Sequence, residues 1–134
     1  MNVTAWLAID RVTLNNSPVL LVPTPAADRR RGVPHLPRSP IRVGGFDQAI
    51  EADPEAFDAA DAEPMLLEPG QFFLFDESTL HYSAENSSEL QRLALAIRIV
   101  PCDTVVGGGK GGPCVLLKGR DSVGANTVVE METE

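Results

Sequence analysis

Two segments of the sequence alternate with a period of two residues, which is the pattern of a β-strand with two different faces. In segment 2–9 the two faces carry Val3, Ala5, Leu7 and Ile9, and Thr4, Trp6 and Ala8. In segment 92–99 they carry Leu93, Leu95, Ile97 and Ile99, and Arg92, Ala94, Ala96 and Arg98. We expect the leucine and isoleucine face of segment 92–99 to be a core face. The opposite face sets a guanidinium beside methyl-sized side chains. This leaves room for a small anion such as a carboxylate, which a planar fork of donors suits.

The proline and glycine content indicates that the rest of the chain is also a β structure. Eleven prolines and eleven glycines among 134 residues are too many for a helical bundle and favour a turn-rich β fold. The hydrophobic fraction of 43% is enough for a core. The sequence therefore predicts one all-β domain over residues 1–134, with about six to eight mostly antiparallel strands and little helix.

The charge argues against two classes of partner. The formal net charge is −8, which disfavours nucleic acid and anionic membranes. No apolar run approaches the roughly 20 residues that span a bilayer, and the N-terminus lacks the basic region of a signal peptide. We therefore expect a cytoplasmic protein whose partner is a small-molecule substrate. Cys102 and Cys114 are too few and too irregularly spaced for a disulfide framework or a zinc site, and we expect reduced, buried or half-buried thiols.

Shorter patterns predict the remaining elements. Strands are expected at 18–23, 71–75 and 114–118, and an edge strand within 126–134. The GGGKGG run at 107–112 lacks the Ser or Thr of a phosphate-binding loop, so it is read as a flexible hairpin connection.

The middle of the chain changes composition twice. An Arg/Pro-rich segment at about 26–45 is interpreted as an irregular insertion, either a solvated loop or an active-site lid that meets an acidic substrate group. His35 lies in it with no carboxylate at ligand spacing beside it. An acidic segment follows at about 46–63, with a short helix predicted before Pro54 and its carboxylates on a solvated face.

A pattern of individual residues runs from the turn before the strand at 71–75 to the start of the strand at 92–99. A Gly-led strand is followed by His-x-Ser, then Asn, then Arg eleven positions after the His; the residues are Gly70, His81, Ser83, Asn86 and Arg92. This pattern resembles the C-terminal half of the phytanoyl-CoA dioxygenase family, whose members, with related halogenases, use non-haem Fe(II) and 2-oxoglutarate. The segment VTAWLAID is similar to an internal strand of that family. The resemblance implies a double-stranded β-helix (jelly roll, cupin-like), apparently incomplete at the N-terminus.

The resemblance also implies roles for individual residues. His81 corresponds to the distal iron ligand, and Arg92 and Ser83 to the residues that hold the far carboxylate of 2-oxoglutarate. Trp6 corresponds to a cosubstrate contact, although it could equally be plain core packing. Arg98, on the same face as Arg92, is the alternative anchor. Asn86 is a substrate-side candidate or an ordinary turn residue.

Two of the family's features are missing. Its Pro-Gly-Ser-His sequence is replaced by Pro23-Thr24-Pro25-Ala26, and its first metal motif, His-x-Asp, would fall before Met1. We therefore expect a truncated oxygenase that is inactive alone and binds Fe(II) poorly. The alternative is a non-catalytic jelly-roll remnant that binds a small anion or a partner protein. An incomplete sheet leaves unpaired edges, so association with a second copy or with a complementing N-terminal segment is expected.

Overall fold

The computed structural model describes residues 2–23, 58–76 and 78–130, and strands dominate this part of the chain. Eight strands are described, with bounds β1 Val3–Ala8, β2 Leu20–Leu21, β3 Glu63–Pro64, β4 Phe72–Asp76, β5 His81–Tyr82, β6 Ala94–Ile99, β7 Pro113–Cys114 and β8 Thr127–Val128. The helical elements are short: the 3-10 turns η1 Leu14–Asn16 and η3 Ala59–Asp61, and the single helical turn α2 Val106–Gly109. No helix in these described ranges is long and apolar enough to cross a bilayer.

The larger sheet has the order β4-β1-β6 and is antiparallel throughout. Its register places Trp6 of β1 between Phe73 of β4 and Ala96 of β6. Paired residues in neighbouring strands project from the same face. Trp6, Phe73 and Ala96 therefore share the face toward the second sheet, which we call the inner face.

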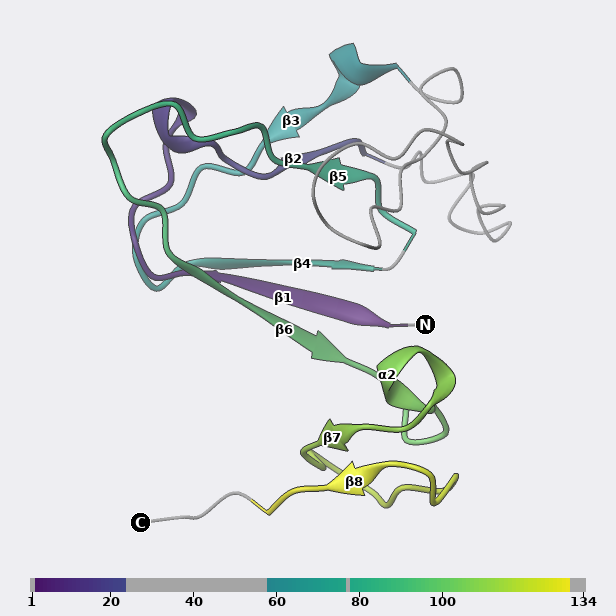
Figure 1. Cartoon of the computed structure of the whole chain (residues 1–134). Helices are drawn as coiled ribbons and strands as arrows, with labels where there is room; N and C mark the ends of the chain where they lie inside the picture. The colour runs from purple at the N-terminus through teal and green to yellow at the C-terminus, as the bar shows by residue number, and fades with distance from the viewer. Residues whose placement is uncertain (1, 24–57, 77, 131–134) are drawn as a thin grey trace.

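The second sheet has the order β3-β2-β5 and lies opposite the inner face (Figure 1). Its strands are only two residues long, and β2 pairs antiparallel with both neighbours. The segments that link β1 to β2, β3 to β4 and β5 to β6 all lie at one end of the two sheets. An isolated bridge between Val12 and Leu67 joins two of these links, and an exposed Arg11–Glu68 ion pair of 2.7 Å lies beside it.

The core lies between the two sheets. Its buried members are Trp6, Ala8, Val12 and Val19, and the partly buried side chains packed against them are Leu21, Leu67, Phe73, Phe75 and Ala94. This cluster is small for the length of the chain. The predicted core face of segment 92–99 is not part of it: Leu93, Leu95, Ile97 and Ile99 lie on the outer face of the larger sheet and are exposed. That prediction was wrong, because it is Ala94, on the opposite face of β6, that packs against the core between the sheets.

The C-terminal unit, residues 101–130, lies beyond the end of β6 (Figure 1). Its β7 and β8 pair in parallel, contrary to the antiparallel pairing expected of the fold. The predicted strand 114–118 is confined to Pro113–Cys114, and the predicted hairpin at 107–112 begins instead with α2. Asn126 explains the helical turn, since its Oδ1 accepts from the Val106 N–H at 2.9 Å and its Nδ2 donates to the Thr104 carbonyl.

The thiols of this unit depart from the sequence expectation in one respect. Cys114 is half-buried, but Cys102 is exposed. The Cys102 thiol donates to the Lys118 carbonyl at 3.2 Å, which fixes the strand-like run after β7 against the end of β6.

The mostly β character predicted from the sequence is confirmed, with small and largely antiparallel sheets. The described strands do not close into a barrel. β2 was predicted to run from 18 to 23 but is limited to two residues. Pro18 and Pro23 have no N–H to donate to a neighbouring strand, which shortens it. The Arg/Pro-rich segment, His35 and the helix predicted before Pro54 lie outside the described residues.

Candidate functional site

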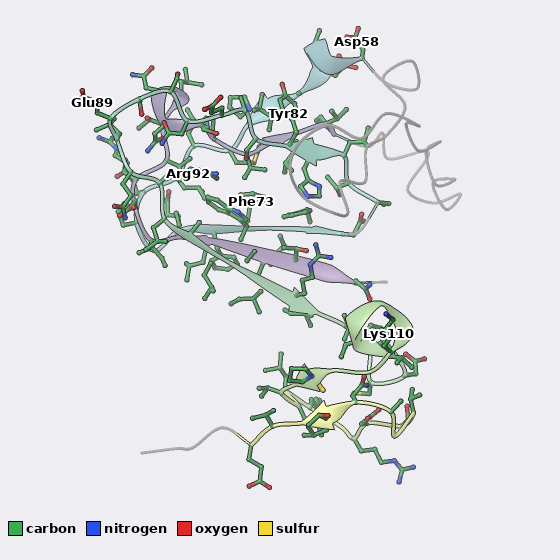
Figure 2. All side chains as sticks on the ribbon, viewed as in Figure 1. Asp58, Phe73, Tyr82, Glu89, Arg92 and Lys110 are labelled. Carbon is green, nitrogen blue, oxygen red and sulfur yellow. The ribbon has the colours of Figure 1, made fainter. Side chains whose placement is uncertain are left out.

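Arg92 lies between the two sheets, two residues before β6 begins (Figure 2). Its guanidinium carbon is 5.5 Å from the centroid of the Trp6 ring, within the range of a cation–π interaction. Trp6 is buried and Arg92 half-buried. The pairing of β1 with β6 thus brings two of the predicted site residues together, although 86 positions of sequence separate them. No carboxylate among the described residues forms an ion pair with Arg92.

A row of stacked rings continues from Trp6 along the inner face. The Trp6 and Phe73 rings are 5.5 Å apart at 26°, and those of Phe73 and Phe75 are 5.5 Å apart at 27°. The His81 ring is 4.7 Å from Phe75 and tilted by 58°. Arg92 and His81 therefore stand at the two ends of this aromatic row. The row connects the larger sheet to β5 of the second sheet.

The sequence analysis did not identify Phe73 and Phe75 as members of the site. The signal that marks them is the alternation of FFLFD, which sets these two rings on one face and Phe72 and Leu74 on the other. Stacking of these rings adds stability to the inner face, since stacked aromatic pairs contribute about 0.5–1.5 kcal/mol beyond the area they bury.

His81 is the first residue of β5 and pairs with Leu21 of β2. Its Nδ1 is 2.9 Å from the Thr79 carbonyl oxygen. A carbonyl only accepts, so Nδ1 is the donor of this bond, and the tautomer that donates it has its free lone pair on Nε2. Metal-bound histidines are commonly fixed in this way by a hydrogen bond from the other ring nitrogen. The side chain is exposed and suited to act as a single ligand.

Ser83 and Asn86 follow β5 in an exposed loop. Ser83 makes no hydrogen bond with the described residues. Asn86 is engaged within the loop: its Nδ2 donates to the Leu90 carbonyl at 2.7 Å, and its Oδ1 accepts from the Ser88 hydroxyl at 2.7 Å and from the Ser88 N–H at 3.1 Å. The observed geometry is that of a turn residue. The substrate contact of Asn86 and the carboxylate contact of Ser83 stay predictions.

Two side chains hold the loop that precedes Arg92. Asn16 is 2% exposed, and its Nδ2 donates to the carbonyls of Arg11 at 2.8 Å and Gln91 at 3.3 Å. The Asp10 carboxylate accepts from the Leu93 N–H at 2.7 Å. Gln91 and Leu93 flank Arg92, so these bonds fix the backbone from which the guanidinium projects. The sequence of residues 11–17, which contains Asn16, indicates only an Asn- and Ser-rich turn.

Ser17 adds a third tie between the same two segments. It is buried, it has a φ of 65°, and its hydroxyl donates to the Ala84 carbonyl. A left-handed backbone conformation is uncommon for serine and is held here by the surrounding contacts. The corner between β1 and β2 is thus fastened to both ends of the loop from Ser83 to Gln91.

The described residues do not fit a complete iron centre. Iron(II) sites of the oxygenase type need two histidines and one carboxylate on one face. Among the residues that the structure describes, no three His, Cys, Asp or Glu side chains gather in a way that could hold a metal ion. An oxoacid carboxylate fits better, because Arg92 offers a half-buried guanidinium beside the small Ala94.

A separate hollow lies among β2, β3 and β4. Its lining residues are Leu21, Val22, Pro23, Glu63, Met65, Leu74, Phe75, Asp76 and Thr79. Of the aromatic row, Phe75 alone belongs to this lining. The hollow therefore adjoins the His81 end of the row rather than the Arg92 end.

Two small sheets, with an arginine between them and a histidine on β5, define a β-protein with a candidate anion site. A family model described as phytanoyl-CoA dioxygenase (PhyH) matches residues 2–94. The match spans more than half of the chain and includes every residue from Trp6 to Arg92 discussed above, so the chain belongs to the phytanoyl-CoA dioxygenase family. Members of this family are generally dependent on Fe(II) and 2-oxoglutarate. In the two other comparisons, no curated protein and no solved structure matches the chain.

Proposed function

We propose that the chain supplies the oxoacid-binding part of an Fe(II)/2-oxoglutarate-dependent oxygenase that hydroxylates or halogenates a small organic substrate. The observation that carries the proposal is the position of Arg92, stacked on Trp6 between the two sheets. Membership of the phytanoyl-CoA dioxygenase family supports the same reading.

The chemistry of the inner face supports a carboxylate ligand. A guanidinium presents a planar fork of donors that matches a carboxylate in a bidentate geometry. Trp6 holds this fork against an aromatic surface, so less side-chain entropy is lost when an anion binds. Ala94, which packs against the core, leaves space where a larger side chain would fill the face. Ser83 would donate its hydroxyl to the same carboxylate.

His81 is the proposed metal-ligand position at the other end of the aromatic row. Its Nδ1–H is fixed by the Thr79 carbonyl, which leaves Nε2 to coordinate. The remaining ligands would come from outside the described residues. Bound iron and oxoacid together would supply the oxidising chemistry, and the described residues would bind and orient the oxoacid.

Calorimetry with 2-oxoglutarate in the absence of metal tests the anchor. Arg92→Ala removes a charge-assisted pair worth roughly 1.5–3 kcal/mol, so we expect affinity to fall by about 10- to 150-fold. Arg98→Ala is the matched control, because Arg98 pairs across from Thr4 on the same inner face. It should leave the affinity close to that of the wild type.

The two variants separate the alternatives. Equal affinity in the wild type and Arg92→Ala would refute the assignment of the anchor. A loss confined to Arg98→Ala would move the anchor to Arg98. Arg92→Lys should recover only part of the affinity, since an ammonium keeps the charge but cannot form the bidentate fork.

A second candidate is a metal-free β protein that binds a small anion. The observation that favours it is the lone imidazole of the described site, since no further ligand joins His81 within the described ranges. Both candidates predict the same result for Arg92→Ala. They differ in whether Fe(II) and 2-oxoglutarate give turnover once a segment that supplies the remaining metal ligands is added to the chain.

A further inference from the structure

The outer face of the larger sheet is apolar along all three strands. Strand pairing aligns three rows on this face, and the rows are Phe72–Leu7–Leu95, Leu74–Ala5–Ile97 and Asp76–Val3–Ile99. The face points away from the sheet β3-β2-β5, so the second sheet does not cover it (Figure 1). We refer to the eight apolar residues of these rows as the outer patch.

The outer patch is open to solvent at its larger side chains. The exposed fractions are 59% for Phe72, 58% for Leu74, 48% for Leu95, 43% for Ile97 and 39% for Ile99. On the inner face of the same strand, Trp6 is 8% exposed. Together the five large side chains leave on the order of 400–500 Å² of apolar surface exposed, which is comparable with the largest apolar patch of a typical monomer, and such patches are often functional.

Charge is almost absent from the outer patch. Asp76 occupies one end of one row, and its Oδ1 is occupied by the Ser78 hydroxyl at 2.6 Å and the Thr79 hydroxyl at 3.1 Å. The net charge of −8 is carried elsewhere. A charged partner would find no complementary group here. A second copy would bring an equally uncharged surface.

We propose that the outer patch is a self-association surface on which a second copy of this chain packs face to face. A two-fold interface uses the same patch on both subunits, so an apolar sheet face with almost no charge can be self-complementary. Two packed sheets lie about 10 Å apart, which lets side chains from both faces interdigitate. In the middle row, the small side chain of Ala5 lies between the larger Leu74 and Ile97. This leaves a depression that large side chains of the other copy can enter.

The area corresponds to a weak contact. The exposed large side chains of two copies bring together about 800–1,000 Å², at the lower limit for a specific interface. Association is therefore expected to be reversible, with a dissociation constant in the micromolar range. The C-terminal unit lies beyond the far end of β6, so the row Phe72–Leu7–Leu95 is the part of the patch farthest from it.

The test is sedimentation equilibrium of the whole chain over a concentration series, with light scattering to fix the mass. The wild type should pass from monomer to dimer, and Leu95→Glu should raise the dissociation constant at least about tenfold by burying an unpaired charge. Leu117→Glu is the matched control. Leu117 is 71% exposed but lies in the C-terminal unit, outside the patch, so this variant should dimerise like the wild type.

A charge exchange separates disrupted packing from disrupted folding. Leu95→Lys should also be monomeric alone, and a mixture of the Leu95→Glu and Leu95→Lys variants should regain association, since opposite charges then meet across the interface. A wild type that stays monomeric at all concentrations would overturn the proposal. Open-ended growth would also overturn it, because pairing of strand edges β4 and β6, unlike a two-fold face, does not close.

Discussion

Asn16 is the residue on which the local geometry of the candidate anion site depends most. It is buried, and it joins the corner after β1 to the backbone next to Arg92. Its Oδ1 also accepts from the Thr13 N–H at 2.7 Å. One amide therefore satisfies several backbone groups from two segments that are distant in sequence.

Replacing Asn16 by alanine should cost about 2–4 kcal/mol of unfolding free energy, because buried donors and acceptors are left without partners. Urea denaturation followed by tryptophan fluorescence measures this, since Trp6 is the chain's one tryptophan. Asn86→Ala is the control: Asn86 also makes three hydrogen bonds but is exposed, and water can replace them. Its cost should stay near 0.5 kcal/mol. Equal losses in the two variants would contradict the role given to Asn16.

At the same scale, the sequence predicts which side chains share one face of a strand, but it does not predict which distant residues they contact. Alternation placed Arg92 with Ala94 on one face and Trp6 on a defined face of its own strand. Strand register then determined that these two faces coincide, and register is fixed by pairing between distant segments. Asn16 was read as a turn residue. Its bond to Gln91 depends on a contact 75 positions away that no local pattern records.

The turn after β4 is the element whose stability depends on a titrating group. The hydrogen bond from the Ser78 hydroxyl is the main reason that the pKa of Asp76 lies below its ordinary value of 3.8. Partial burial opposes this shift, and the Ser78 N–H and Thr79 groups add to it. A lowered pKa in the folded state means that the ionised carboxylate stabilises the fold above the unfolded pKa. This contribution disappears as the pH falls through the lowered value.

Asp76→Asn should therefore destabilise the protein at neutral pH, and the difference from the wild type should shrink as the pH falls below 3.8. Chemical denaturation of both proteins across the acidic range gives the two stability curves. Ser78→Ala should weaken the same pH dependence, because it removes the largest stabilising contact of the ionised form. Parallel curves for the wild type and Asp76→Asn would show that this carboxylate is not linked to folding.

Element lengths were predicted less well than element types. The three long strands β1, β4 and β6 were located within two residues, because long alternating or apolar runs are a strong signal. The run Cys114–Lys118 is as apolar as a strand but pairs only at its first residue, and Val115 and Leu117 remain exposed. Apolar composition alone does not provide a neighbouring strand, and the leucine face of β6 was misassigned for the same reason.

At the scale of the whole molecule, the described residues include more of the proposed oxoacid-binding site than of the proposed metal site. Arg92 lies over the Trp6 ring, where we propose that a carboxylate binds. His81 is fixed for coordination but is a single ligand, and the affinity of a metal site comes from several ligands held together.

The resulting prediction is that the isolated chain binds Fe(II) weakly and does not turn over 2-oxoglutarate. The chain has two histidines, and the second, His35, lies in the sequence VPHLP with no carboxylate at ligand spacing. The measurement is anaerobic calorimetry with Fe(II), followed by assay of succinate release with Fe(II), ascorbate and 2-oxoglutarate in air. We expect a low affinity for Fe(II), little change in that affinity in His81→Ala, and no succinate above the rate without protein.

Stoichiometric iron binding and succinate release, both abolished in His81→Ala and retained in a His35→Ala control, would instead show that His81 belongs to a complete centre. The other ligands of that centre would then come from carboxylates outside the described residues. Loss of activity in both histidine variants would identify His35 as the second imidazole, and the oxoacid anchor at Arg92 would stand in either case.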